Sequence, residues 1–171
     1  MTFLPRIAAL IDSLNEYIGR ACAWLVLVAV IVSAGNALAR YALGLSSNAF
    51  LEIQWYLFAL IFLVAAGYTH KHNGHVRVDV FYSHFSVRTR ALIDLAGGVL
   101  FLLPMSVVIL YLSWPPFLAS FQIGETSPDP GGLLRWPIKL AIPLGFALLT
   151  LQGISEVIKK IALLRKSKAE E

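Results

Sequence analysis

Two opposite charges, Arg40 and Glu52, stand at facing ends of two long apolar runs of the sequence. Placing either charge alone in hydrocarbon costs about 2.5–3.5 kcal/mol, so neither is expected to face lipid unpaired. We predict that Arg40 and Glu52 pair with each other or with a partner subunit, and that the nearby Gln54 belongs to the same interface. The alternative is that Arg40 extends to lipid phosphates while Glu52 complements the positive start of its helix.

Histidine and cysteine are the other residue types that could hold a cofactor. All four histidines lie between His70 and His84, outside the apolar runs, and their spacing does not match a structural zinc site. A haem protein built on four helices needs histidines inside the bundle. The single cysteine, Cys22, excludes an internal disulfide, CxxC chemistry and a thiolate metal cage. We therefore expect no metal, no cofactor and no catalytic residue.

Four apolar runs must position these residues. They cover approximately residues 21–41, 50–68, 91–112 and 136–158. At 1.5 Å per helical residue, each run spans a hydrocarbon core of about 30 Å. Hydrophobic residues make up 58% of the chain and charged residues 14%, against about 25% charged in soluble domains. The sequence predicts an all-α integral membrane protein, a single domain of four transmembrane helices over residues 1–171.

Local signals refine the four predicted helices. Gly97 and Gly98 predict a close helix approach in the third helix, and Pro115 and Pro116 predict that it ends or turns there. The segment 122–134, rich in proline and glycine, is expected to be an irregular loop.

One further acid, Asp94, lies at the start of the third predicted helix. Arg90 and Asp94 have the spacing of an ion pair one helical turn apart. The middles of the four runs are almost wholly apolar, so the chain is not expected to bind a polar substrate by itself.

The first twenty residues have an amphipathic helical pattern. Asp12 and Glu16 fall on the polar face, opposite an apolar stripe. This pattern predicts a helix that lies on the membrane surface or docks against a partner. A soluble extension of the first crossing explains the pattern equally well.

The basic residues are distributed unevenly among the connections. Eleven lie in residues 1–20, in the 69–90 connection and in the C-terminal tail, whereas one, Arg135, lies in the other two connections. By the positive-inside rule, both termini and the 69–90 connection are cytoplasmic. The basic residues form no stripe that could follow a phosphate backbone, so no nucleic-acid partner is expected.

A set of residues and short motifs recurs in one known family. The set comprises Asn36, Arg40-Tyr41, Glu52, Gly67, the HVRVD string His75–Asp79, Glu125, Ser127, Gly132, Trp136, Lys139 and the IPLGF run Ile142–Phe146. On these residues, roughly 20–160 of the chain resembles the small membrane subunit (DctQ type) of TRAP transporters, the tripartite ATP-independent periplasmic carriers. The chain departs from the family at residues 48–51, where a tryptophan and a second acid are often found.

The resemblance implies a division of labour in the bacterial inner membrane. A periplasmic substrate-binding protein captures an organic acid, and a large membrane subunit (DctM type) carries it with sodium ions. The small subunit binds the large one, within membrane lipids, as part of a fixed scaffold, and its loop 122–134 could help to dock the periplasmic protein. His75, Arg77 and Asp79 would fix a helical arm between the second and third helices, by an Arg–Asp pair or by contacts to lipid phosphates. A solvated charged loop is the alternative for these three residues.

Two other function classes remain open on the sequence. One is a membrane-anchored subunit of a redox complex, which the lack of intramembrane histidines disfavours. The other is an autonomous small four-helix exporter, which normally needs a charge near a helix midpoint, whereas Glu52 lies close to a helix end.

Overall fold

The computed structural model of the chain describes residues 3–45, 47–75, 82 and 84–169. Helices make up almost all of this part, and its only β pairing is an isolated bridge between Thr126 and Leu134. The elements in chain order are α1 (Phe3–Leu43), α2 (Asn48–Val64), α3 (Ala66–Lys71), α5 (Val87–Gly97), the π-helical turn η1 (Gly98–Leu102), α6 (Leu103–Ile123) and α7 (Trp136–Ala169).

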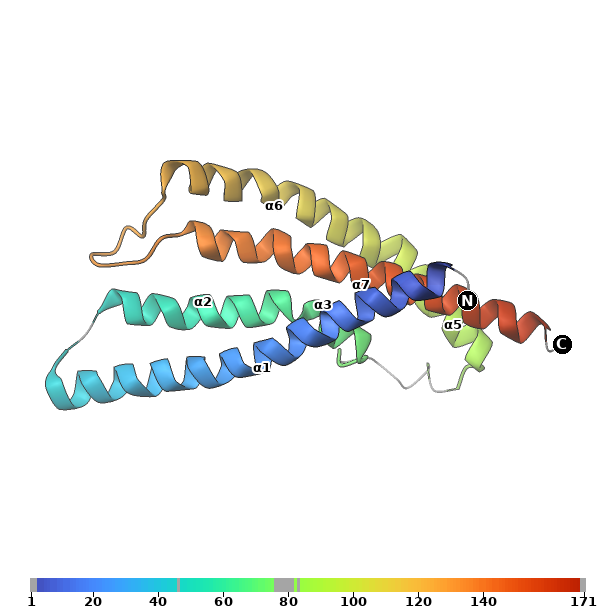
Figure 1. Ribbon diagram of the computed structural model, residues 1–171, viewed down its shortest axis with the longest axis horizontal. Coiled ribbons are helices and arrows are strands. Elements are labelled where there is room, and N and C mark those ends of the chain that lie inside the picture. The colour runs from blue at the N-terminus through green and yellow to red at the C-terminus, as the bar shows by residue number, and fades with distance from the viewer. Residues whose placement is uncertain (1–2, 46, 76–81, 83, 170–171) are drawn as a thin grey trace.

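These elements form four rods that are long and apolar enough to cross a membrane: α1, α2 with α3, α5 with η1 and α6, and α7. The all-α class and the four transmembrane helices predicted from the sequence are thereby confirmed. The rods lie roughly along one axis (Figure 1). The start of α1 and the end of α7 lie at one end, which we call the terminal end, and residues 44–45 and 124–135 lie at the opposite, loop end.

The first twenty residues are a direct continuation of the first crossing. α1 is one unbroken helix of 41 residues, about 60 Å long, which is twice the thickness of the hydrocarbon core. The segment is therefore not a separate helix, and its location relative to the membrane surface stays a prediction. Of the two interpretations of this segment, the structure supports the extension of the first crossing.

The third crossing continues through Pro115 and Pro116, contrary to the prediction that it ends or turns there. α6 runs on to Ile123 and stops at Gly124, whose φ of 60° is left-handed and suits glycine. The two prolines remove two backbone N–H donors, but a membrane helix accommodates such losses because local adjustments satisfy the freed carbonyls. The loop that follows has no helix or strand, as the sequence predicts.

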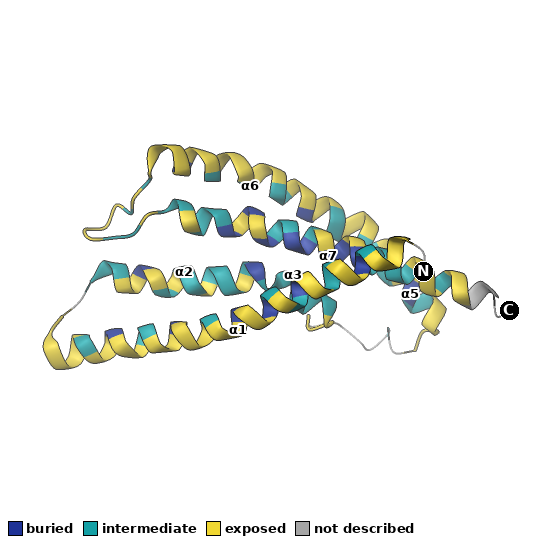
Figure 2. Cartoon of the chain, viewed as in Figure 1, coloured by how far each residue is buried: buried dark blue, intermediate teal, exposed yellow. Residues whose placement is uncertain are grey.

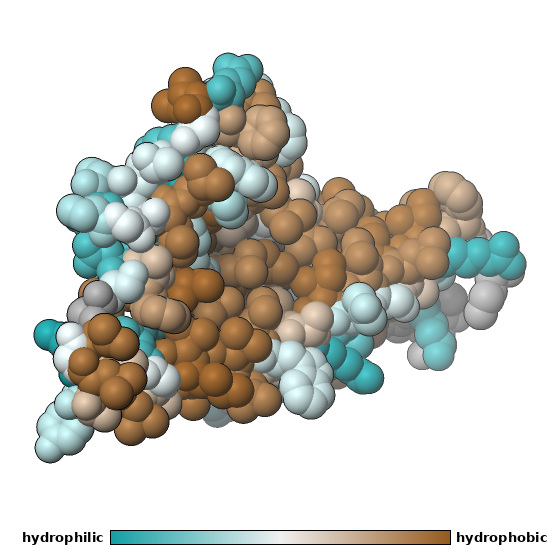
Figure 3. All heavy atoms as spheres, turned by 60° about the vertical axis from the view of Figure 1, so that its left-hand side comes forward, coloured by the Kyte–Doolittle hydropathy of each residue, from teal (hydrophilic) through white to brown (hydrophobic). Residues whose placement is uncertain are grey.

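α7 is the central helix of the bundle. Of its most apolar stretch 44% is buried, whereas the corresponding values for the other three rods are 6–17%. α7 contacts α1, α2, α3, α5 and α6, and α6 packs mainly on α7. Buried positions accordingly concentrate along α7, while the outer sides of α1 and α6 are exposed (Figure 2). These exposed sides are largely apolar, as Figure 3 shows for one face of the molecule.

Three glycines allow helices to approach closely, and they are not the two that the sequence predicts. A Cβ on Gly67 would lie 2.2 Å from Asn15 Oδ1, and a Cβ on Gly145 would lie 2.5 Å from the backbone oxygen of Leu63. A Cβ on Gly19 would lie 2.2 Å from the ring of Tyr68. A Cβ on Gly97 would meet nothing within 4 Å, and one on Gly98 would make only an ordinary contact.

Candidate partner-binding surfaces

The carboxylate of Glu52, near the start of α2, binds the 124–135 loop. Glu52 is 4% exposed and accepts hydrogen bonds from the Ser127 hydroxyl and, at 2.6 Å, from the Leu133 backbone N–H. The predicted direct pair between Arg40 and Glu52 is therefore absent from the structure. The free-energy cost of burying the carboxylate is offset by hydrogen bonds from these donors, which lie 75 and 81 residues away along the chain.

Further contacts fix the loop on α2. The Asn48 side-chain amide donates to the Pro130 carbonyl at 3.0 Å, and the Tyr56 hydroxyl donates to the Leu134 carbonyl at 3.0 Å. At Gly132 a Cβ would lie 2.4 Å from the Ser127 Cβ and 2.9 Å from Glu52 Oε1. Only glycine fits at this position without displacing the Glu52 contact.

The base of the loop is fixed by charge. Glu125 forms an ion pair with Lys139 in the first turns of α7, and its backbone carbonyl accepts from the Arg135 N–H at 2.8 Å. The hydrogen bond from Lys139 lowers the pKa of Glu125, so this carboxylate is ionised at neutral pH. The Arg135 guanidinium lies over the Trp55 ring, 5.6 Å from its centroid. The loop lacks regular structure, but side chains hold it against both α2 and α7.

Replacing Glu52 by alanine is expected to free this loop. Ser127 and the Leu133 N–H lose their acceptor, at a cost of about 1–3 kcal/mol, so amide exchange in residues 124–135 should accelerate about tenfold or more. Glu52→Gln should give an intermediate rate, because one amide oxygen still accepts. Gln54→Ala is the matched control, because that side chain lies two residues on and faces another side of α2. Equal exchange in all variants would show that Glu52 does not hold the loop.

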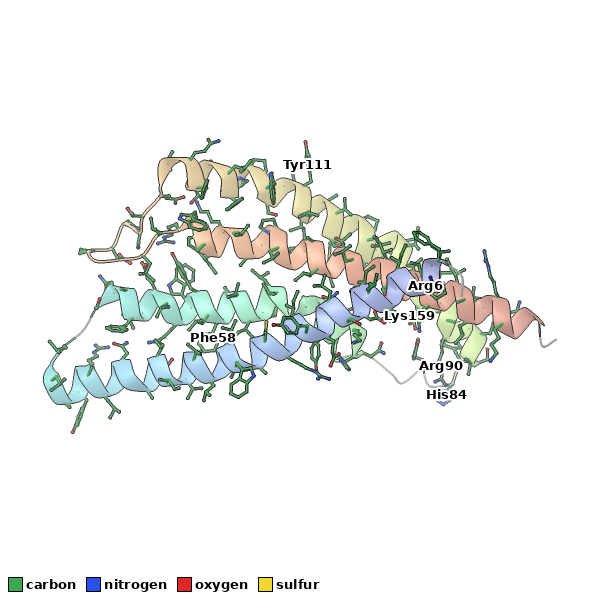
Figure 4. All side chains as sticks on the ribbon, viewed as in Figure 1. Arg6, Phe58, His84, Arg90, Tyr111 and Lys159 are labelled. Atoms are coloured by element: carbon green, nitrogen blue, oxygen red, sulfur yellow. The ribbon has the colours of Figure 1, made fainter. Side chains whose placement is uncertain are left out.

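At the terminal end, polar residues of α1 bind α7. Asp12 accepts from the Ser155 hydroxyl at 2.7 Å, the Gln152 amide at 2.9 Å and the Lys159 ammonium at 3.0 Å. Asn15 donates to the Gln152 side-chain oxygen at 3.1 Å. Gln152 and Ser155 are fully buried. In Figure 4, Lys159 lies where α1 crosses α7, whereas Tyr111 of α6 points away from the bundle.

Glu16 links α1 to the end of α3. Its carboxylate binds Lys71 at 2.8 Å, His72 at 2.7 Å and, within α1, Arg20 at 2.9 Å. The polar face that the sequence pattern shows for residues 1–20 is therefore directed at α3 and α7 of the same chain. The sequence periodicity correctly identified the residues of this face, but it did not indicate which helices cover them.

A second ion pair joins the third and fourth crossings at the terminal end. Asp94 accepts from the Lys160 ammonium at 2.6 Å and from the Tyr82 hydroxyl at 2.8 Å. Arg90 donates to the Phe85 carbonyl at 2.8 Å and lies over the Tyr82 ring. The partner of Asp94 on α7 could not be identified from local spacing, because 66 residues separate it from Lys160.

The HVRVD string falls at the edge of the described residues. His75 is exposed, and its ring lies 6.2 Å from that of His70. Arg77 and Asp79 lie outside the described residues, so their role in the predicted arm between the second and third helices stays a prediction. Within the described ranges, no group of three or more histidine, cysteine, aspartate or glutamate side chains is arranged to hold a metal ion.

Arg40 and Gln54, two of the predicted interface residues, lie together at the loop end. Both line a groove between α1 and α2, together with Asn36. The structure thus brings Arg40 and Gln54 together and separates both from Glu52, which lies on the loop side of α2.

Comparison with known families decides the class of protein to which this membrane bundle belongs. The model of the family described as "Tripartite ATP-independent periplasmic transporters, DctQ component" matches residues 28–163. This chain belongs to the DctQ family. The match spans α2, the 124–135 loop and the greater part of α7, so the Glu52 contacts of this DctQ protein lie inside the matched region. Comparison with curated proteins found no match.

The family and the fold together make the DctQ chain a multi-pass membrane component of a TRAP transporter. The α7 residues that bind Asp12 lie within the matched span, whereas Asp12 itself precedes residue 28. The N-terminal half of α1 is therefore attached to the family's common core by the Asp12 and Glu16 contacts.

Proposed function

We propose that this DctQ protein is the non-catalytic scaffold subunit of its transporter. It binds a large DctM-type subunit, and the complex takes up an organic acid, coupled to sodium ions, from a periplasmic substrate-binding protein. The observation that carries the proposal is the shallow burial of three crossings: 6% of the most apolar stretch of the third rod is buried, and 11% and 17% for the second and first. Such faces are available to a larger membrane partner.

The distribution of polar groups supports a scaffold role. The ion pairs described above lie at the loop end, as Glu125–Lys139 does, or in the terminal half, as Lys159–Asp12 does. Between α6 and α7, Thr150 donates to Ser106 at 3.0 Å, so these two hydroxyls serve helix packing. A carrier needs polar groups at mid-depth that are available to a substrate. We place the terminal end in the cytoplasm of a bacterium because the chain's basic residues concentrate there.

Reconstitution of the three components tests this function. Liposomes with the chain and the large subunit should accumulate the organic acid only when a sodium gradient and the binding protein are both present. Liposomes that contain the chain alone should accumulate nothing. Transport by the chain alone would overturn the scaffold role and favour an autonomous exporter, and a redox-active absorbance spectrum would favour a redox subunit.

A further inference from the structure

The groove between α1 and α2 at the loop end is lined mainly by polar side chains and has a volume of ≈ 530 Å³. Its α1 residues recur at helical spacings of three and four, which places them on one face of the helix. The lining residues are Ser33, Asn36, Ala37, Arg40, Tyr41 and Gln54.

We propose that this groove receives a membrane helix of the large TRAP subunit. That helix presents a carboxylate to Arg40 and, about one turn deeper, an N–H or O–H donor to Asn36. The proposal rests on the function proposed above and assigns the surface through which the two subunits bind.

Asn36 presents to the groove a hydrogen-bond acceptor that no described residue satisfies. Its side chain is 8% exposed, and its Oδ1 atom is buried without a hydrogen-bond partner in the described part of the chain. Neither Ser33 nor Gln54, which line the same groove, donates to it. A buried acceptor without a donor is costly, so the partner that covers the groove must supply an N–H or O–H group.

Arg40 shows that the groove also lacks an anion. The guanidinium is exposed in the last turn of α1 and forms no ion pair with any residue that the structure describes. The nearby acid, Glu52, is occupied by Ser127 and the Leu133 N–H. Since a guanidinium is always charged, a counter-ion for Arg40 has to come from outside the described residues, and a partner subunit can supply it.

The depth of Asn36 favours a protein helix over a lipid headgroup. A lipid phosphate can accept from Arg40, which lies at the end of α1. Asn36 lies four residues, or about 6 Å, further into the membrane, where lipid offers only hydrocarbon. A neighbouring transmembrane helix can offer a carboxylate and a donor at two depths, and polar side chains commonly join membrane helices in this way.

Two variants test the docking site, each in the complex of the full chain with the large subunit from the same genome in detergent. Asn36→Leu and Arg40→Gln should each weaken binding of the large subunit about tenfold or more. In the isolated chain, Asn36→Leu should leave the melting temperature unchanged or raise it, because it removes an unsatisfied buried polar group. Arg6→Gln is the matched control: it removes an exposed arginine at the terminal end and should leave binding unchanged.

The outcomes separate this docking site from the function on which it rests. If the unaltered chain binds the large subunit and both variants bind it equally well, the docking site is wrong and the function stands. If, in addition, Arg40→Gln lowers the phospholipid that co-purifies with the chain, the groove holds a lipid phosphate instead. If the unaltered chain does not bind the large subunit at all, the docking site and the proposed function both fail.

Discussion

Gly145→Ala is expected to lower the free energy of unfolding of the isolated chain in mixed micelles by about 1–3 kcal/mol, the usual range for overpacking. A Cβ at this position would lie 2.5 Å from the backbone oxygen and 2.7 Å from the backbone carbon of Leu63. Backbone atoms cannot rotate away as a side chain can, so α2 must shift relative to α7. The shift would also disturb the neighbouring core contacts among Cys22, Val64 and Leu148.

Gly97→Ala is the matched control for this substitution. A Cβ at Gly97 meets nothing within 4 Å, and the residue has ordinary helical φ and ψ. The change should leave stability unchanged or raise it by about 0.5–1 kcal/mol, since alanine favours helix over glycine. If Gly145→Ala were as stable as Gly97→Ala, α2 and α7 would not be in close backbone contact.

Asp12→Ala is expected to cost about 2–4 kcal/mol and to release the N-terminal half of α1 from α7. The substitution removes the acceptor of three donors, of which Gln152 and Ser155 are fully buried. Ser155 retains a hydrogen bond to the Ala8 carbonyl at 3.2 Å, which limits the loss. Unfolding in mixed micelles gives the energy, and limited proteolysis of the first twenty residues gives the location.

Arg20→Ala provides the comparison for Asp12→Ala. Arg20 also forms an ion pair on α1, with Glu16 at 2.9 Å, but its side chain is 76% exposed. Exposed pairs of this kind contribute about 0.5 kcal/mol or less, so proteolysis of the segment should not change. Similar losses in the two variants would mean that burial at Asp12 contributes nothing beyond surface charge.

The number and placement of the crossings could be read from the sequence, but their mutual arrangement could not. An apolar run indicates only that a segment lies out of water. It does not show whether the segment contacts lipid or another helix, because lipid tails are as apolar as a neighbouring helix. The central position of α7 in the bundle therefore cannot be deduced from its amino-acid composition. The prediction at Pro115 and Pro116 failed for a related reason, because a helix break that water would favour is disfavoured in a membrane.

The sequence allowed the residue types of the candidate interface to be predicted, but not the contacts that these residues make. An isolated charge near a helix end indicates that a partner exists, and for Glu52 the structure shows that partner. The partner of Glu52 is a loop 75 to 81 residues away, and no local spacing encodes such a contact. In the sequence, Asn36 stands out only as part of a family pattern. What distinguishes Asn36 is a buried amide oxygen that accepts no hydrogen bond, and only the folded structure reveals it.

The helix that contacts every other rod is also the last to be synthesised. During translation α1, α2 and α6 are all synthesised before α7, so they are made before their common packing surface exists. The first two rods can form a hairpin with each other, but the third has little to pack on until α7 arrives. The bundle therefore closes only after α7 has been added, and until then the insertion machinery or the surrounding lipid must hold the earlier helices.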